Sequence, residues 1–493
     1  MKLSELLSVS EIGYDSKKIS DCEIGYIETN TQSAVENCEK MPLFVCIDGT
    51  NYNSHVDIAR LIKCGIRAFV TNENAKIYCS GKNINIIKVK DTRKALALLA
   101  RSFYGFPDRE LFTVGITGTK GKTTVTYMLR AVFEAFGKKC GIIGTNGIIY
   151  GGNTYECDNS TPGSLEYYGA LRQMADDGVS CVFCEVTSQA LMQYRTFGTV
   201  FDVAVFTNLF PDHIGKNEHF DFDEYKSCKG YLFSQCKKAV LNTDSEHSEY
   251  FQNICRENGV EYICFSAERD ADIFCRDITV LDTGSEFSVG ESRFAIPLPG
   301  VFNVSNALCT VSVARLCKVP DEIIARGLSG VCVYGRCERV PNPDGVNIII
   351  DYAHNKESLG NILEALKQSC RGKLYCVFGA GGDRSRLRRA GMGQAAAKYA
   401  DVIIVTSDNP RSESREQIIA DILPGLIDAK GECVTIPDRR KAIYYALGRA
   451  SLNDTVLLAG KGGQTFEEVC GVKYPFDERK VVEDFYRERV TPQ

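Results

Sequence analysis

The chain has 493 residues, of which 44% are hydrophobic and 25% are charged. These fractions match average globular proteins, so they exclude a disordered chain and a fibre. At roughly 100–200 residues per domain, the length predicts about three domains. With 58 Lys and Arg against 63 Asp and Glu, the net charge of −5 gives no general attraction to nucleic acid or to an anionic membrane.

The 22 cysteines are scattered through the chain and often lie inside apolar runs such as 181–184. This distribution predicts reduced core residues rather than a disulfide framework. The first seven residues lack the apolar core of a signal peptide, and no segment supplies the roughly 18 apolar residues of a membrane helix. We therefore expect a cytoplasmic enzyme that acts on small molecules.

The order of apolar runs and turn signals predicts an α/β fold with three domains. Residues 1–108 form a small N-terminal α/β domain that ends at a break in 104–108. Residues 109–335 open with a strand at 111–116 and alternate apolar runs with helical patterns, which predicts a central domain with a parallel sheet. Residues 336–493 are expected to form a Rossmann-like C-terminal domain. Its strand candidates are 347–351, 374–378, 402–406 and 455–459.

A glycine-rich loop at 115–124 lies between the strand at 111–116 and a helical pattern that ends near Gly137. Backbone N–H groups of such a loop surround phosphate, Lys122 can reach the β- and γ-phosphates of ATP, and Thr123 can hold Mg²⁺. Ile116 stands where the strict motif has its first glycine, so the loop alone could be an ordinary turn. The flanking strand and helix favour an ATP site. Its predicted residues are Gly118, Thr119, Lys120, Gly121, Lys122, Thr123 and Thr124.

This form of the loop resembles that of the Mur ligase superfamily, and the resemblance covers nearly the whole chain. Further matching motifs follow in the family's order. They are Asn159–Pro162, Glu185–Leu191, Thr207–Leu209, Asp212–His213, Phe302–Asn306, Gly335–Glu338 and Asp351–His354. Within the family the chain looks most like the UDP-N-acetylmuramoyl-tripeptide synthetases, which add the third residue of the peptidoglycan stem peptide.

The resemblance implies a uridine-binding-like N-terminal domain, a central P-loop ATPase domain and an ATP-dependent, ADP-producing amide ligase. The carboxylate of a UDP-N-acetylmuramoyl-dipeptide would attack ATP, and an amino group would displace phosphate from the acyl phosphate. Asp408-Asn409-Pro410-Arg411 resembles the signature of members that add meso-diaminopimelate. The implied role is peptidoglycan and cell wall biogenesis, and thereby cell shape and division. A monomer is expected.

Four residues carry the catalytic prediction: Lys122, Glu185, His213 and Lys229. Glu185 and His213 each follow an apolar strand, where ligand crevices of parallel sheets lie. A rim glutamate and a structural histidine are the alternatives without the resemblance. The resemblance implies that Thr123, Glu185, His213 and Lys229 hold Mg²⁺, with Lys229 carbamylated to N6-carboxylysine. Carbamylation turns a cation into an anion that can hold Mg²⁺. Lys226 competes for this role, and the family spacing selects Lys229.

Substrate residues are carried over by position. Ser33, Thr161, Ser188, Gln193 and Arg195 match positions that hold the UDP-linked dipeptide. Asn303, Asn306, Arg336 and Asp351 match positions around the adenine, phosphates and ribose of ATP. Each of these could by itself be an ordinary polar surface residue or turn cap.

The amino-acid pocket is predicted from two arginines. Arg389 and Arg411 match the pair expected to bind carboxylates of diaminopimelate, since a planar guanidinium pairs with a carboxylate in bidentate fashion and repels the ammonium of lysine. A solvated basic loop is the alternative for the arginine cluster at 384–389. The other predicted pocket residues are Asp408, Asn409, Pro410, Gly460 and Gln464.

The chain departs from the family pattern at three places. Gly463 and Gln464 stand where the family has histidine and glutamate, and Thr187 and Gln189 replace a serine and a histidine. Residues 30–33 stand where an Asp-Ser-Arg run is expected. Three alternatives therefore stay open: the same reaction with L-lysine, a Mur-like ligase with another carboxylate acceptor, and a non-catalytic ATP-binding relative.

Overall fold

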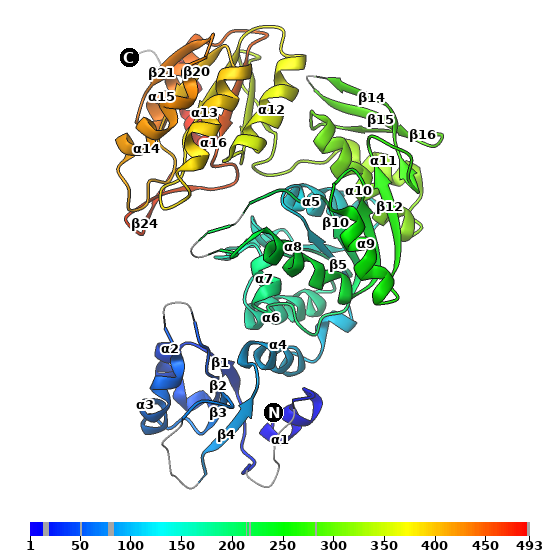
Figure 1. The fold of residues 1–493 in the computed structure, drawn as a ribbon, viewed down its shortest axis with the longest axis vertical. Helices are drawn as coiled ribbons and strands as arrows, with labels where there is room; N and C mark the ends of the chain where they lie inside the picture. Colours follow the sequence, from blue (N-terminus) through cyan, green and yellow to red (C-terminus); the bar gives the residue numbers. More distant parts are fainter. Residues whose placement is uncertain are drawn as a thin grey trace. The chain divides into compact units, whose positions relative to one another are not determined.

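A computed structural model describes residues 1–12, 19–49, 52–76, 83–212, 214–215, 218–281 and 283–490. The chain divides into two compact units (Figure 1). Unit 1 contains residues 1–119, 138–240 and 249–262, and unit 2 contains residues 120–137, 241–248 and 263–493. The predicted domain boundaries at 108 and 335 stay a prediction.

The N-terminal part of unit 1 is a four-stranded sheet with the strand order β1-β2-β3-β4, in which every neighbouring pair is parallel. Apolar residues of α1 and α4 pack with the sheet in one buried cluster, and a second cluster contains Phe44 and Phe69. Helix α4 begins after Asp91, whose carboxylate accepts hydrogen bonds from the amides of Arg93 and Lys94. The elements are α1 (Leu3–Val9), β1 (Tyr26–Glu28), α2 (Thr31–Glu36), β2 (Pro42–Val45), α3 (Ile58–Lys63), β3 (Ala68–Asn72), β4 (Asn85–Val89) and α4 (Thr92–Phe103).

The central sheet has nine strands in the order β13-β12-β11-β10-β5-β9-β6-β7-β8. Strands β10, β5, β9 and β6 run parallel, whereas β7 and β8 extend the edge with antiparallel pairing. Every residue of β9 is buried, as expected for an inner strand of a parallel sheet. These elements are β5 (Phe112–Thr117), β6 (Cys140–Gly144), β7 (Gly147–Tyr150), β8 (Asn153–Tyr155), α6 (Ser164–Asp176), β9 (Cys181–Glu185), α7 (Ser188–Met192), β10 (Phe201–Phe206), α8 (Phe222–Gly230), β11 (Cys236–Asn242), α9 (Ser248–Glu257) and β12 (Glu261–Ser266).

Unit 2 begins with α5, whose buried face packs against α10 and α11. Helix α10 is buried over most of its length, including the polar residues Asn303 and Asn306. A small antiparallel sheet β14-β15-β16 belongs to the same unit. The elements are α5 (Lys122–Ala135), β13 (Ile273–Phe274), β14 (Arg276–Leu281), β15 (Gly284–Val289), β16 (Ser292–Ile296), α10 (Val301–Leu316) and α11 (Asp321–Ser329).

The C-terminal part of unit 2 is a six-stranded sheet with the order β17-β18-β22-β19-β20-β21. All of its neighbouring strands are parallel except the antiparallel edge strand β17. Apolar residues of α15 and α16 pack on the inner strands in one core cluster. The elements are β17 (Glu338–Val340), β18 (Asn347–Asp351), α12 (Lys356–Ser369), β19 (Leu374–Phe378), α13 (Leu387–Tyr399), β20 (Val402–Val405), α14 (Arg415–Ile422), β21 (Glu432–Thr435), α15 (Arg439–Arg449), β22 (Thr455–Ala459), β23 (Phe466–Val469), β24 (Val472–Pro475) and α16 (Glu478–Val490).

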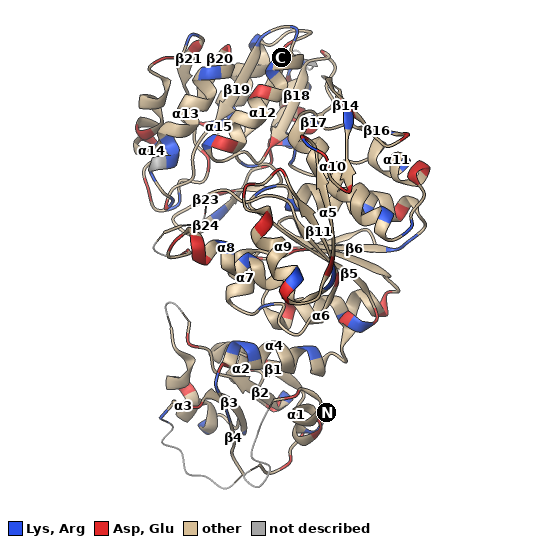
Figure 2. Cartoon of the chain, turned by 45° about the vertical axis from the view of Figure 1, so that its right-hand side comes forward, with Lys and Arg blue, Asp and Glu red and all other residues tan. Residues whose placement is uncertain are grey.

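The predicted α/β class and the parallel sheets are confirmed. The strands expected at 347–351, 374–378 and 455–459 have the predicted bounds. The strand expected at 111–116 is shifted by one residue at both ends, and the one expected at 402–406 ends one residue earlier. The cysteines that the structure describes are free thiols, as expected. Among the described residues, no helix is long and apolar enough to cross a membrane. Figure 2 shows basic and acidic residues interspersed along the chain, in keeping with the small net charge.

A buried ion pair between Arg439 and Glu478 contributes to the stability of the C-terminal sheet, and this contribution can be tested. Arg439 and Glu478 are at most 4% exposed, and the Arg439 guanidinium also donates to the backbone oxygens of Ser407 and Ala459. Arg439→Leu leaves the Glu478 carboxylate buried without its partner, so we expect a loss of about 3–5 kcal/mol of stability in this sheet. Hydrogen exchange of the β22 amides measures it. The control is Arg440→Leu, which removes a partly exposed pair with Asp484 and should cost about 1 kcal/mol or less. Equal losses would contradict this account.

Candidate active site

The carboxyl ends of four parallel strands lie at one edge of the central sheet. Because β10, β5, β9 and β6 are parallel neighbours, the residues that end them or follow them come close together. These residues are Thr207 after β10, Gly118 after β5, Glu185 at the end of β9 and Thr145 after β6. The edge therefore contains the start of the glycine-rich loop and one of the predicted metal ligands.

Glu185 is 1% exposed, and Thr145, which follows the neighbouring strand β6, contacts both of its carboxylate oxygens. The Thr145 amide donates to Oε1 at 2.8 Å, and the Thr145 hydroxyl donates to Oε2 at 3.1 Å. A Cβ on Gly144 would lie 2.4 Å from Oε1, so glycine is needed at that position. A carboxylate supplies oxygen, the ligand atom that Mg²⁺ prefers.

The start of the glycine-rich loop is fixed by contacts with the segment after β10. A Cβ on Gly118 would lie 1.9 Å from the hydroxyl oxygen of Thr207, so only glycine fits there. The Thr119 amide donates to the oxygen of Asn208 at 2.9 Å, and the Phe210 amide donates to the Thr119 hydroxyl at 3.0 Å. These contacts define the conformation of the start of the loop.

Lys229 of α8 is brought to this loop. Its side chain is 1% exposed, its Nζ donates to the oxygen of Gly118 at 3.0 Å, and it lies 4.4 Å from the centre of the Tyr225 ring. Lys226 instead pairs with Asp223 at 2.7 Å on the helix surface. The structure thus places Lys229, rather than Lys226, beside the predicted phosphate loop. His213 lies outside the described residues.

Three of the four predicted dipeptide-binding residues of the central domain, Thr161, Gln193 and Arg195, form one hydrogen-bonded network beside Glu185. The Thr161 hydroxyl donates to the backbone oxygen of Glu185 at 2.8 Å. Arg195 donates to the oxygen of Thr161 at 2.6 Å and to the Gln193 side chain at 3.0 Å. Burial lowers the pKa of the Arg195 guanidinium, and the positive charge of Arg93 lowers it further. Arg195 and Arg93 are neighbouring cations with few anions close to them, so their surroundings favour an anionic ligand.

Ser188, the fourth of these central-domain residues, has a partner that the sequence did not indicate. Its hydroxyl lies 2.8 Å from Nε2 of His219, an imidazole with no exposed surface. Ser33 lies apart from them, in α2, and its hydroxyl donates to the Glu28 carboxylate at 2.5 Å. Glu28, Thr145 and His219 were not predicted. A signal existed only for Thr145, which follows the apolar strand 140–144.

The second half of the loop begins α5. Gly121 has a φ of +88°, and a Cβ there would lie 2.3 Å from Oδ1 of Asn306, so the asparagine side chain abuts the glycine. Asn306 donates to Asn303 at 3.3 Å, and Asn303 donates to the oxygen of Pro299 at 2.9 Å. Lys120, Lys122 and Thr124 belong to the same loop and helix start. Backbone N–H groups at such a helix start favour phosphate.

Arg336 and Asp351 lie close to this helix start within unit 2. Arg336 donates to the Thr123 hydroxyl at 3.4 Å, and its guanidinium lies 4.4 Å from the centre of the Tyr352 ring. Asp351, at the end of β18, accepts from the amides of Cys337 and Ala353, each at 2.8 Å. Burial raises the pKa of the Asp351 carboxyl, and the charge of Arg336 opposes that rise. Arg336 and Thr123, both predicted to meet ATP, are thereby brought together.

The two arginines predicted for the amino-acid pocket have different surroundings. Arg389 is 1% exposed, and its Nη atoms donate to the carboxylates of Glu413 and Asp421 at 2.7–2.9 Å. Arg411 is partly exposed and pairs with Glu468 at 3.0 Å. Arg389 therefore ties α13 to the segment of α14, while Arg411 faces a more open surface. That Arg389 binds a substrate carboxylate stays a prediction.

The remaining pocket residues surround a buried lysine. Lys461 has no exposed surface and pairs with Asp408 at 3.5 Å, and its Nζ donates to Asn409 at 3.0 Å. Gly460 has a φ of +117°, and a Cβ there would lie 2.4 Å from the Asp408 carboxylate. Gln464 accepts a hydrogen bond from Asn409 at 2.8 Å. Pro410 lies in the same segment, and Gly382 is packed against its backbone oxygen.

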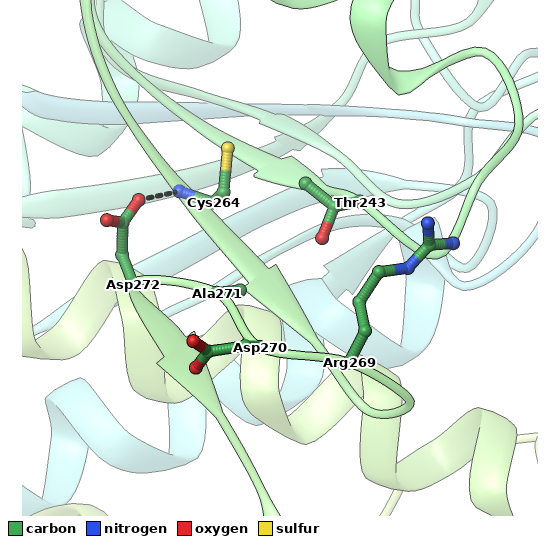
Figure 3. A pocket seen from close by; sticks show the side chains of 6 residues that line it. All are labelled: Thr243, Cys264, Arg269, Asp270, Ala271 and Asp272. Carbon is green, nitrogen blue, oxygen red and sulfur yellow. Dashed lines mark hydrogen bonds between the residues drawn. The ribbon is translucent and has the colours of Figure 1, made fainter.

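A separate depression of about 540 Å³ lies in unit 2 near the end of β11 (Figure 3). Its lining residues are Thr243, Cys264, Arg269, Asp270, Ala271 and Asp272. None of the predicted site residues lines it. Among the described residues there is also no group of three His, Cys, Asp or Glu side chains that could hold a metal ion.

The family is decided by comparison with known proteins. Residues 116–314 match the Mur ligase middle domain, and residues 335–462 match the Mur ligase, glutamate ligase domain. UDP-N-acetylmuramoyl-L-alanyl-D-glutamate–2,6-diaminopimelate ligase of Geobacillus thermodenitrificans is 38% identical over 91% of this chain and 92% of its own. The chain belongs to the Mur ligase family.

Other relatives agree with this assignment. The ligase of the same name from Clostridioides difficile is 34% identical to this Mur ligase over 97% of the chain and 95% of its own. A solved structure of a ligase with that name covers the full length of both chains with a TM-score of 0.70 at 24% identity, which supports the fold. Mur ligases are ATP-dependent amide ligases, so the enzyme class implied by the family resemblance is confirmed.

The contact between Gly121 and Asn306 gives a test of nucleotide binding. Gly121→Ala places a methyl group against Asn306 at the start of α5, so we expect ATP affinity to fall at least about ten-fold, or about 1.4 kcal/mol. Gly137→Ala is the matched control, because Gly137 also has a positive φ, +80°, but no atom within 4 Å of the added carbon. Calorimetric titration with ATP and Mg²⁺ distinguishes the two variants. If both variants bind ATP equally weakly, backbone strain at a positive φ would explain the loss, and the contact with Asn306 would not.

Proposed function

We propose that this Mur ligase adds meso-diaminopimelate to UDP-N-acetylmuramoyl-L-alanyl-D-glutamate in peptidoglycan synthesis. The observation that carries the proposal is the match, over 91% of the chain or more, to relatives whose names state that reaction. The site geometry supports it, because Glu185, Lys229 and the glycine-rich loop are adjacent at one sheet edge. Nucleotide-linked substrates imply a reaction in the cytoplasm, and we infer that the enzyme acts as a monomer.

The proposed reaction has two steps. The terminal carboxylate of the dipeptide attacks the γ-phosphorus of ATP and ADP leaves, which gives an acyl phosphate. The amino nitrogen of diaminopimelate then attacks the acyl carbon, loses a proton and displaces inorganic phosphate. Neither step needs a protein nucleophile, so catalysis rests on positioning and on neutralising phosphate charge.

We assign the groups of the chain to these steps as follows. Lys122 and the backbone amides at 118–124 hold the phosphates, and Arg336 adds a cation beside Thr123. Asn303, Asn306 and Asp351 contact the nucleoside. Thr161, Ser188, Gln193 and Arg195 hold the dipeptide, and residues 1–108, with Ser33, bind the UDP group. Residues 336–493 bind the amino acid through Arg411 and its neighbours.

Mg²⁺ is the proposed metal, held by Thr123, Glu185, His213 and carboxylated Lys229. It supplies charge neutralisation at the phosphate oxygens when bound. Glu185 fits this role because it supplies carboxylate oxygens, whose orientation the bonds from Thr145 fix. Lys229 fits it only after carboxylation, because an ammonium group donates hydrogen bonds and repels a cation. In its unmodified form Lys229 donates to Gly118.

The choice of amino acid can be tested directly. With ATP and UDP-N-acetylmuramoyl-L-alanyl-D-glutamate, we expect phosphate release and a product of the tripeptide mass with meso-diaminopimelate. The rate with L-lysine should be lower by at least about a hundred-fold, since lysine has no second carboxylate for Arg411. Preference for lysine would contradict the amino-acid assignment, and absence of product with both would contradict the proposed acceptor.

The role of Lys229 can be separated from that of Lys226. Lys229→Ala removes the group that would carry the carbamate, so we expect turnover to fall at least about a hundred-fold. A ¹³C-carbamate signal obtained with labelled bicarbonate should disappear in the same variant. Lys226→Ala removes only a surface pair and should keep both the signal and a rate within about two-fold. Loss of the signal in Lys226→Ala instead would reverse the assignment.

A further inference from the structure

Two cysteines are partners across neighbouring strands of the central sheet. Cys140 begins β6 and Cys181 begins β9, and the two residues face each other directly in the parallel register of these strands. Partnered residues of a sheet have their side chains on the same face, and neighbouring strands lie about 4.8 Å apart. A disulfide joins residues whose Cα atoms are about 4.4–6.8 Å apart. The register therefore brings Cys140 and Cys181 within the span of a disulfide.

The two thiols also contact each other. A hydrogen bond from the Cys140 thiol lowers the pKa of the Cys181 thiol, and burial opposes this effect. The positive charge of Lys138 lowers the pKa of Cys181 further. In Cys46 and Cys236, by contrast, burial raises the pKa of the thiol to about 12. Because the thiolate is the form of cysteine that reacts with oxidants, Cys181 is the more reactive thiol in this comparison.

The pair lies just below the surface, at the amino ends of both strands. Cys140 and Cys181 are 4% and 3% exposed, and the segments 136–139 and 176–178, which precede the strands, are exposed. A small oxidant can therefore reach the thiols from this end of the sheet. The carboxyl ends of the same strands lead to the hydrogen-bonded pair Thr145 and Glu185. A bond between the cysteines would thus join the two strands that place the Glu185 carboxylate.

We propose that Cys140 and Cys181 form a reversible oxidation site, at which hydrogen peroxide converts the two thiols into a disulfide between β6 and β9. The Cys181 thiolate attacks one peroxide oxygen and the O–O bond breaks, which gives a sulfenic acid and, after proton uptake, water. The Cys140 thiolate then attacks the sulfenic sulfur, forms the S–S bond and releases a second water. Two electrons pass from the thiols to the peroxide, and the two thiol protons end in the water.

The disulfide has two consequences for the enzyme. It protects Cys181 from further oxidation to a sulfinic acid, which is irreversible for most proteins. It also fastens β6 to β9 and so stabilises the strands that carry Thr145 and Glu185. A dithiol such as dithiothreitol restores both thiols by exchange.

Peptide mapping of the native enzyme after treatment with hydrogen peroxide tests the inference. After alkylation and digestion, we expect a cross-linked peptide pair that contains Cys140 and Cys181 and lacks two hydrogen atoms, and dithiothreitol should remove the cross-link. Hydrogen exchange of the β9 amides should slow at least about ten-fold in the oxidised enzyme and recover after reduction. In the unchanged chain, Cys181 that stays reduced, or that is oxidised only to a sulfenic or sulfinic acid, would overturn the inference.

Two variants distinguish this pair from general oxidation. Cys140→Ala removes the partner, so the cross-link should be absent and dimedone should trap a sulfenic acid on Cys181. Cys184→Ala is the matched control, because Cys184 lies in the same strand, has no exposed surface and is paired with Ile143. It should keep the cross-link between Cys140 and Cys181. A cross-link from Cys181 to Cys184 in place of Cys140 would contradict the proposed pair.

Discussion

Parallel pairing of β10, β5, β9 and β6 is the constraint on which the phosphate-binding edge depends. It brings Thr207, Gly118, Glu185 and Thr145 to adjacent strand ends, although they are separated by up to 89 positions in the chain. Two glycines make the approach possible, since a side chain at 118 or 144 would overlap Thr207 or Glu185. The buried Lys229 then reaches the loop through its contact with Gly118. A phosphate-binding edge thus follows from strand direction and from two positions that tolerate only glycine.

In the C-terminal sheet, buried cations that pair with carboxylates hold distant segments of the chain together. Arg389, Arg439 and Lys461 are almost fully buried, and each is paired with at least one carboxylate. Burying a charge is costly unless it is paired and hydrogen-bonded, so these groups fix the segments that carry their partners. One result is the fixed amide of Asn409 and, through it, the direction of Gln464.

The sequence predicted the parts of the fold that depend on local pattern. Apolar runs located the inner strands, and the glycine-rich loop located the start of α5. The antiparallel strands β7 and β8 were not predicted, because the apolar run of β7 does not by itself indicate antiparallel pairing, and β8 has no apolar run. The resemblance selected Lys229 over Lys226, and their different burial agrees with that choice. The sequence could not predict the pairing of Arg389 with Glu413 and Asp421, nor the bond from Thr145 to Glu185, because both join residues that are distant in the chain.

The central claim is that this Mur ligase activates a substrate carboxylate by phosphorylation. The direct measurement uses UDP-N-acetylmuramoyl-L-alanyl-D-glutamate with ¹⁸O in its terminal carboxylate, and follows the released phosphate by ³¹P NMR during turnover with meso-diaminopimelate. Since the carboxylate oxygen that attacks ATP leaves with the phosphate, the account predicts one ¹⁸O atom in each phosphate formed from the doubly labelled substrate. Unlabelled phosphate released alongside the amide product would contradict it.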